Sequence, residues 1–230
     1  EKKFSNKTII CENPLFHKFY NFQPIKNKFY IAYNFRFHKC LQYLKKKINL
    51  DRVYFVDAES SSYLPMWRKN ADYSKNYSAF PKKGGGVLLD MSHEIDYLKW
   101  LFKNFKISKI YKNKISNLKI LSEDIAVVFG YLKKNTLVKT KLTYFNKLPK
   151  RCLTICMKDG SQIYLDLLKS EIKFFANNTT KTLRLEKYSQ SKTTKYMYSE
   201  ILKNNFQNIC SLKEALNLLL QIESSKKINF

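Results

Sequence analysis

Residues 1–60 contain short, largely apolar runs separated by polar stretches. Thr8–Cys11 and Phe29–Tyr33 are runs of this kind and predict buried strands, and Arg52–Ser60 reads as a third strand. Apolar side chains recur at helical spacing over residues 39–48, which predicts a helix. We interpret this opening as strand–loop–strand fragments of α/β type.

A second helical pattern follows an aromatic-rich irregular stretch and three consecutive glycines, Gly84–Gly86. From about residue 87 to 103, one set of apolar residues falls on a single stripe, which predicts a helix that faces a core. The members of this stripe are Leu88, Met91, Ile95, Leu98 and Phe102. Asp90, His93 and Tyr97 form a second stripe on the same predicted helix.

Beyond Lys106 the pattern changes to alternating apolar and polar positions, which is typical of half-buried strands. Turn residues separate the segments, most clearly at Lys158–Ser161, where Asp-Gly is a hairpin signal. The predicted strands are 107–116, 123–132, 136–146, 151–158, 161–167 and 171–176. Helices are expected over 193–205 and 211–225, and the second begins with a capping-box pattern, Ser211 with Glu214.

The predicted fold is an α/β remnant over residues 1–35, followed over residues 36–230 by an α+β unit. The larger unit is expected to be an open, mostly antiparallel sheet with helices on one face. Its smaller neighbour cannot stand alone, because two strands do not make a stable layer. No G-x-G-x-x-G follows a predicted strand, so the chain contains no dinucleotide-binding fingerprint of its own.

Composition changes this picture only slightly. With 44% hydrophobic and 15% aromatic residues, the chain is of the globular class. Its net charge of +25 suggests a nucleic-acid partner, but 38 of the basic residues are scattered Lys and only five are Arg. Base reading and bidentate phosphate contacts favour Arg, and A/T-rich codons alone would give the Lys excess. We therefore expect no nucleic-acid partner, although a positive field would attract an anionic substrate.

Cysteine usage and hydropathy bear on the compartment. The five cysteines are odd in number and contain no C-x-x-C pair, which is typical of reduced thiols and not of a disulfide framework or a metal site. No apolar run is long enough to cross a bilayer, and no signal-peptide pattern opens the chain. We expect a soluble, cytoplasmic protein with no bound metal and no membrane partner.

Asp90 and His93 are the candidate acid–base pair of the predicted helix. A carboxylate one helical turn from an imidazole can orient it and raise its basicity, as a general base requires. Glycines ahead of the helix would allow a ligand to approach the backbone closely. The alternative is an ordinary amphipathic helix after a flexible turn, and the pattern alone leaves both interpretations open. His17 and His38 lie among apolar and aromatic residues and are interpreted as packing or surface residues.

Four motifs together resemble one family. They are Glu12-Asn13-Pro14, Ala32-Tyr-Asn34-Phe-Arg36-Phe-His38, Tyr63-Leu-Pro-Met-Trp67-Arg68 and Gly84-Gly-Gly-Val-Leu-Leu-Asp90-Met-Ser-His93-Glu-Ile-Asp96-Tyr. In this order and spacing they resemble the Gfo/Idh/MocA oxidoreductases, most closely the branch associated with surface-sugar biosynthesis. The resemblance covers nearly the whole chain. It implies a Rossmann domain, of which residues 1–35 would be the C-terminal remnant, followed by a sheet domain that covers the cofactor.

The resemblance also implies a function and a set of site residues. The function is hydride transfer between NAD or NADP and a hydroxyl-bearing carbon of a sugar or sugar derivative. The implied catalytic residues are His93 as proton relay, Asp90 as its orienter and Asn13 at the position of the family's lysine. The implied cofactor contacts are Glu12, Pro14, Trp67 and Arg68, and the implied substrate contacts are Asn34, Arg36 and Tyr63.

Two features depart from the family pattern. Asp90 stands three residues before His93, where four is common, which still keeps the pair on one helix face. Asn13 replaces the lysine that holds the reacting oxygen, and an amide cannot carry the positive charge that would stabilise a developing alkoxide. Lys18 is a conceivable substitute. The resemblance further implies that the first Rossmann strands and the glycine-rich turn are missing, so we expect either a fragment or the product of a decayed gene.

Two interpretations of the whole chain therefore compete. The first is part of a dinucleotide-dependent sugar oxidoreductase. The second is a non-catalytic relative that serves as an oligomerising structural module, with Asn13 as the sign of lost chemistry. In both, the exposed sheet face around residues 123–146 carries aromatic and β-branched residues at alternate positions and is expected to form a homo-oligomer interface.

Overall fold

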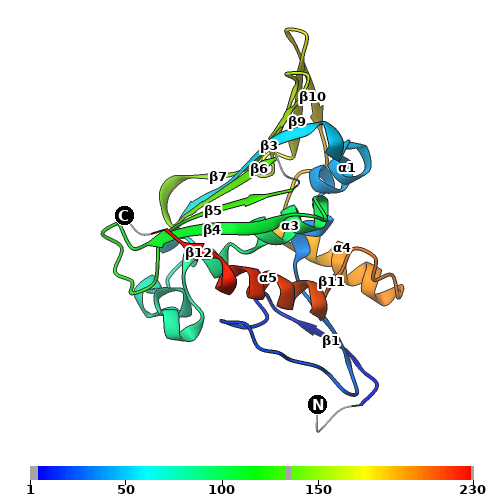
Figure 1. The fold of residues 1–230 in the computed structure, drawn as a ribbon. Coiled ribbons are helices and arrows are strands. Elements are labelled where there is room, and N and C mark those ends of the chain that lie inside the picture. Colours follow the sequence, from blue (N-terminus) through cyan, green and yellow to red (C-terminus); the bar gives the residue numbers. More distant parts are fainter. Residues whose placement is uncertain (1–4, 133–135, 229–230) are drawn as a thin grey trace.

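A nine-stranded sheet and a separate three-stranded sheet make up the structure, with helices packed between and beside them (Figure 1). The computed structural model describes residues 5–132 and 136–228. Figure 1 shows the helices α3 and α5 beneath the large sheet, and the small sheet beyond them. The predicted fold class, an open and mostly antiparallel sheet with helices on one face, is confirmed.

The small sheet joins the two ends of the chain. Strands β1 (Thr8–Cys11) and β2 (Lys28–Ile31) are parallel, and β11 (Cys210–Ser211) pairs antiparallel with β2. Both predicted N-terminal strands therefore form. The side chains of Ile31, Tyr33 and Phe35 belong to the same apolar core as the large sheet. A boundary at residue 35 thus stays an interpretation based on the resemblance, while packing is continuous across it.

The large sheet has the strand order β10-β9-β8-β7-β3-β6-β5-β4-β12. Within the part of the chain that the structure describes, only β3 with β6 and β12 with β4 are parallel. The strands are β3 (Val53–Tyr63), β4 (Lys106–Asn113), β5 (Ile125–Tyr131), β6 (Leu137–Thr143), β7 (Phe145–Met157), β8 (Gln162–Asp166), β9 (Glu171–Ala176), β10 (Thr179–Arg184) and β12 (Lys226–Lys227). The six strands predicted beyond Lys106 and the strand predicted over Arg52–Ser60 all form within this sheet, and β10 and the two-residue β12 were not predicted.

Helix positions follow from local caps. Helix α1 (Lys39–Lys47) begins at His38, whose ring nitrogen accepts a hydrogen bond from the Cys40 amide at 3.2 Å. Helix α4 spans Gln190–Leu202. Helix α5 (Leu212–Ser224) begins with the predicted capping box, in which the Ser211 hydroxyl accepts from the Glu214 amide and the Glu214 carboxylate accepts from the Ser211 amide. These side chains satisfy amides that the first helical turn leaves unpaired.

The helix predicted over 87–103 is interrupted, which corrects the expectation of one continuous element. Helix α2 spans Val87–Asp90 and α3 spans His93–Leu101, with a turn at Met91 and Ser92 between them. In this turn the Ser92 amide bonds to the Leu89 carbonyl and the Glu94 amide to the Met91 carbonyl, so the backbone tightens to three-residue steps. Asp90 and His93 therefore do not share one regular helix face.

Two further findings concern classes of protein considered above. No helix within residues 5–132 and 136–228 has the length and apolar character needed to cross a bilayer. The five cysteines are free thiols, and no cluster of His, Cys, Asp and Glu among the described residues could hold a metal ion.

Candidate functional site

The candidate site lies where β1 and β2 end. These strands are parallel, so their C-terminal ends meet at one edge, the place where ligands bind in open α/β sheets. Asn13 follows β1, and its side-chain amide donates to the Ala32 carbonyl at 2.8 Å. Tyr33 follows Ala32 in the chain. The centroid of its ring lies 5.5 Å from that of the His93 ring, and its hydroxyl lies 3.2 Å from Ser92 Oγ. The structure thus brings the predicted catalytic residues Asn13 and His93 to the same two-residue segment.

His93 is held by aromatic rings and not by a carboxylate. Besides Tyr33, the ring of Phe35 lies 5.2 Å away, and His93 Nδ1 is buried without a hydrogen-bond partner. The side chain as a whole is partly exposed. Burial, and next the positive charge of Arg151, lower the pKa of His93 to about 3. At neutral pH the imidazole is therefore uncharged and has one ring nitrogen that no protein group occupies.

Asp90 does not orient His93, which corrects the predicted pairing. One carboxylate oxygen of Asp90 accepts from the Tyr144 hydroxyl at 2.6 Å, and the other oxygen has no hydrogen-bond partner. Burial raises the pKa of Asp90. The cause of the difference is the turn between α2 and α3, which directs the two side chains to different neighbours.

The predicted cofactor residues Trp67 and Arg68 gather around Asp90 and its partner. The Trp67 ring lies edge-on to the Tyr144 ring at 5.3 Å, and its indole N–H donates to the Ser62 hydroxyl at 2.8 Å. The Arg68 guanidinium lies 5.5 Å from the centroid of the Tyr77 ring. Trp67 remains 37% exposed, so this cluster presents an open aromatic edge and a cation to solvent.

The remaining predicted contacts of cofactor and substrate are scattered. Glu12 is exposed and Pro14 partly buried, next to Asn13 and joined to it by a cis peptide bond. Tyr63 ends β3, with the Lys147 ammonium 5.8 Å from its ring. Asn34 is buried and donates to the Thr194 hydroxyl at 2.9 Å.

Arg36 lies in an internal ion pair, a position that does not fit the predicted substrate contact. Its guanidinium donates to both oxygens of Asp96, at 2.9 and 2.6 Å, and to Glu214 at 3.1 Å. The Arg36 side chain is only 2% exposed. This residue therefore ties the segment after β2 to α3 and α5, and each of its three guanidinium nitrogens is bonded to a protein carboxylate.

The three glycines ahead of α2 are required by packing. Gly84 and Gly86 have φ angles of +81° and +120°, which residues other than glycine rarely adopt. A Cβ at Gly85 would lie 2.2 Å from the Tyr77 carbonyl, and one at Gly86 would lie 2.3 Å from the Glu123 carboxylate. These contacts account for the glycines without a ligand. A Cβ at Gly84 would lie 3.1 Å from the Cβ of His17, so this loop runs beside the loop after Asn13.

Sequence reasoning missed an ion pair beside His93. Arg151 on β7 has its guanidinium 4.2 Å from the Phe35 ring centroid, and its Nε lies 2.7 Å from the fully buried Glu94 carboxylate and donates to the Ser60 hydroxyl. Burial raises the pKa of Glu94, an effect that the Arg151 charge opposes. One signal was present: arginine is rare in this chain, and Arg151 is one of only five.

Comparisons with known proteins give matches at the level of structure. No family model and no curated protein sequence matches the chain. Levoglucosan dehydrogenase in complex with NADH superposes with a TM-score of 0.74 at 14% identity, covering 94% of this chain and 70% of that one. An oxidoreductase from Thermotoga maritima gives 0.70 at 12% identity, with 92% and 67% covered. UDP-N-acetylglucosamine 3-dehydrogenase from Acidithiobacillus ferrooxidans gives 0.62 at 14% identity, with 85% and 59% covered.

These likenesses identify the fold. The chain spans 59 to 70% of the length of the three proteins, and the matched region is the C-terminal part of their chains. The order of motifs in the sequence predicted the same relationship. This chain has the fold of the C-terminal part of the Gfo/Idh/MocA-type oxidoreductases.

Proposed function

We propose that the chain forms the substrate side of an NAD(P)-dependent oxidoreductase, which transfers a hydride to or from a hydroxyl-bearing carbon of a sugar or sugar derivative. The observation that carries the proposal is that Asn13 and His93 contact two adjacent residues just beyond the end of β2, Ala32 and Tyr33. The fold supports it, since the similar structures include two sugar dehydrogenases, one of them bound to NADH. A substrate for surface-sugar biosynthesis fits the branch that the motifs resemble.

The residues present fit the nicotinamide end of a dinucleotide and not its phosphates. Trp67 and Arg68 offer an exposed aromatic edge and a cation, and Glu12 and Pro14 stand beside Asn13. The sequence holds no G-x-G-x-x-G turn to bind the pyrophosphate. When bound, the dinucleotide supplies or accepts the hydride.

The protein groups would hold the reacting hydroxyl. His93 is neutral and partly exposed, and because its Nδ1 is buried, the other ring nitrogen, Nε2, would accept a hydrogen bond from that hydroxyl. A pKa of about 3 makes it a weak base at neutral pH, so it acts as a transient relay and not as a stable proton store. The second hydrogen of the Asn13 amide, beyond the one bonded to Ala32, is free to donate to the reacting oxygen.

Two substitutions in the protein that contains this chain test the assignment. His93→Ala should lower hydride transfer to a sugar substrate by a factor of about 10² to 10⁴, the usual share of acid–base catalysis. His17→Ala, an exposed histidine nearby, is the matched control and should leave the rate unchanged. Asn13→Lys should raise the rate, because charged hydrogen bonds are roughly twice as strong as neutral ones and a donor at a reacting oxygen is worth on the order of 3 kcal/mol. A His93→Ala protein with full turnover would refute the relay.

One observation favours the alternative, a non-catalytic relative. The Asn13 amide is bonded within the protein and Asp90 is bonded to Tyr144, so His93 has no carboxylate to orient it. If neither the natural protein nor Asn13→Lys reduces NAD or NADP with any sugar tested, this alternative is the better account. At the site of Asn13 and His93, the 230-residue chain should bind NAD and NADP weakly or not at all in calorimetric titration, because the sequence holds no G-x-G-x-x-G turn.

We also propose a homo-oligomer through the open sheet face. Its outward residues on β5 and β6 include Val127, Phe129, Tyr131 and Leu137, of which the last two are 44% and 49% exposed. Lys139 pairs with Asp57 in the same face at 2.9 Å, so the surface is apolar at one end and charged in the middle. Light scattering that finds a strict monomer at micromolar concentrations would count against this interface.

A further inference from the structure

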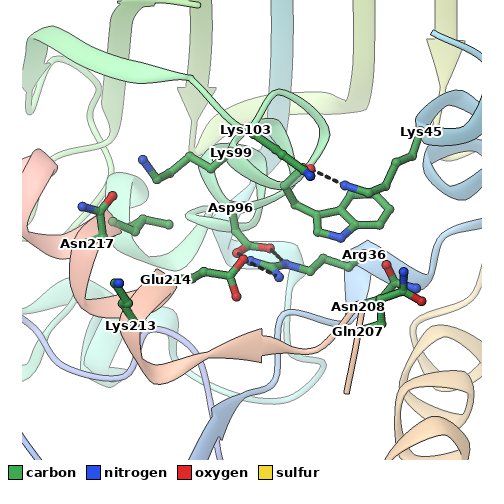
Figure 2. Close-up of a pocket in the computed structure, with 12 residues that line it drawn as sticks. Arg36, Lys45, Asp96, Lys99, Lys103, Gln207, Asn208, Lys213, Glu214 and Asn217 are labelled. Carbon is green, nitrogen blue, oxygen red and sulfur yellow. Dashed lines mark hydrogen bonds and ion pairs between the residues drawn. The ribbon is translucent and has the colours of Figure 1, made fainter. Parts of the chain in front are cut away.

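A cavity of about 490 Å³ lies between α1, α3 and α5, and no candidate catalytic residue lines it (Figure 2). Arg36 and the carboxylates bonded to it lie at its centre, as Figure 2 shows. Helix α3 supplies Lys99 and Trp100 to its wall, α1 supplies Lys45, and α5 supplies Lys213. The cavity is therefore built by elements far apart in the sequence.

The wall of this cavity carries excess positive charge. Four lysines surround the central ion pairs, namely Lys45, Lys99, Lys103 and Lys213 (Figure 2). None of them forms an ion pair with a carboxylate within residues 5–132 and 136–228. The two carboxylates of the wall, Asp96 and Glu214, are both bonded to Arg36. With Arg36 included, five cations face two carboxylates, so the lining is positive by three charges.

Two of these lysines, Lys45 and Lys99, are half-buried. The Lys45 ammonium donates to the Trp100 carbonyl and lies 4.0 Å from the centroid of that indole ring. The Lys99 ammonium donates to the Phe105 carbonyl at 3.3 Å. Burial lowers the pKa of each to about 8. Each ammonium has three donors and one carbonyl acceptor within the protein. An anion in the cavity would therefore satisfy the remaining donors and offset the cost of burying the charge.

We infer that this cavity is a binding site for a phosphorylated small molecule, whose phosphate groups meet the ammonium groups of Lys45, Lys99, Lys103 and Lys213. Its volume decides the size of the ligand, because cavities of roughly 300 to 1,000 Å³ hold an organic molecule and greatly exceed one phosphate ion. The side-chain amides of Asn208 and Asn217 and the apolar Leu218 in the wall suit the remainder of such a ligand.

The shape of the site favours a small molecule over a nucleic acid. A single strand is bound by an extended basic groove with exposed aromatic rings on which bases stack. Trp100, the aromatic residue of this wall, is 5% exposed and one face of it is covered by Lys45. The site is independent of the hydride-transfer assignment, since it shares none of Asn13, Asp90 or His93.

Calorimetric titration of the 230-residue chain with pyrophosphate, ADP and citrate tests the inference. The titrations are run at about 0.15 M salt, where attraction between exposed charges is largely screened. We expect saturable binding of one equivalent of pyrophosphate or ADP, and weaker binding of citrate. Tighter binding of ADP would identify an organic phosphate as the ligand, and tighter binding of pyrophosphate would identify a free polyphosphate. Absence of binding of both phosphates at millimolar concentration would overturn the inference.

Charge-matched variants separate a built site from general attraction. Lys99→Gln with Lys103→Gln should weaken binding by about tenfold or more, as the loss of one or two charged hydrogen bonds predicts. The control, Lys47→Gln with Lys195→Gln, removes the same charge from exposed positions outside the cavity and should change affinity less than about twofold. Equal weakening in the two double variants would overturn the site. Lys213→Gln repeats the affinity measurement with a change to an exposed side chain of α5, so that no half-buried lysine is altered, and it should also weaken binding.

Discussion

Asp96→Asn is expected to be among the most damaging single substitutions in this chain. Asp96 accepts two hydrogen bonds from the Arg36 guanidinium, at 2.9 and 2.6 Å, and the Asp96 and Arg36 side chains are 3% and 2% exposed. The asparagine side chain has nearly the same shape but no charge, and it offers one acceptor where two are needed. Arg36 would keep its charge and retain only Glu214, whose side chain is 47% exposed.

The magnitude follows from this burial. A charged hydrogen bond contributes about 1.5 to 3 kcal/mol, and removing one partner of a buried ion pair costs about 3 to 5 kcal/mol because it leaves the other charge uncompensated. We therefore expect Asp96→Asn to lower the free energy of unfolding by about 3 to 5 kcal/mol. Glu214→Gln is the matched control, because it removes the other carboxylate bonded to the same guanidinium. The more exposed ion pair of Arg36 with Glu214 should contribute about 1 kcal/mol or less to the free energy of unfolding.

Equilibrium unfolding in urea, followed by far-ultraviolet circular dichroism, measures both variants. The double variant Arg36→Met with Asp96→Leu should recover much of the lost stability, because it removes the stranded charge together with its partner. A loss below about 1 kcal/mol for Asp96→Asn, or one no larger than that for Glu214→Gln, would show that the ion pair is solvated and that the reasoning from burial is wrong.

Three further predictions rest on single contacts. Burial lowers the pKa of His38 to about 4, so unfolding takes up a proton between pH 6.5 and 4. The free energy of unfolding should therefore fall by about 3 kcal/mol as the pH falls through this window, which urea titrations at several pH values measure. His38→Asn, which still caps α1, should abolish this part of the pH dependence. Gly86→Ala should lower the free energy of unfolding by roughly 3 kcal/mol, since the φ of Gly86 is +120° and the new Cβ would meet the Glu123 carboxylate. Gly160→Ala, whose Cβ would meet nothing within 4 Å, should cost about 1 kcal/mol, and thermal melts compare the two variants. Ser211→Ala should cost about 1 kcal/mol by removing the cap of α5, with unchanged stability as the contrary result in the same melts.

Features set by neighbouring residues could be predicted from the sequence. The alternation of apolar positions located the strands from β4 to β9, and the pair Ser211 and Glu214 located the start of α5 within the chain. Strand β10 was missed because its residues, Thr179–Arg184, are mostly polar and exposed and show no apolar alternation. At the edge of a sheet, hydrogen bonding to β9 is enough to form such a strand.

Features set by distant residues could not be predicted. Asp90 and His93 have a spacing that suits one helix, but Asp90 is bonded to Tyr144, 54 positions later, and the helix is interrupted between them. Arg36 belongs to a motif that predicts substrate contact, yet its partners are 60 and 178 positions away. The motifs thus located the neighbourhood of the candidate site, while the hydrogen bonds within it depend on which segments the fold brings together.

The central place of β3 has a consequence for how the chain folds. Strand β3 lies between β6 and β7, which follow each other along the chain but pair with β3 and not with one another. Its partners are residues 137–143 and 145–157, so the paired residues are 82 to 104 positions apart, and closing such long loops slows folding. During synthesis both edges of β3 remain unpaired until β6 and β7 emerge from the ribosome. A nascent chain that stops before residue 137 would present both edges of this strand to other chains, so this is the interval in which pairing between chains would compete with folding.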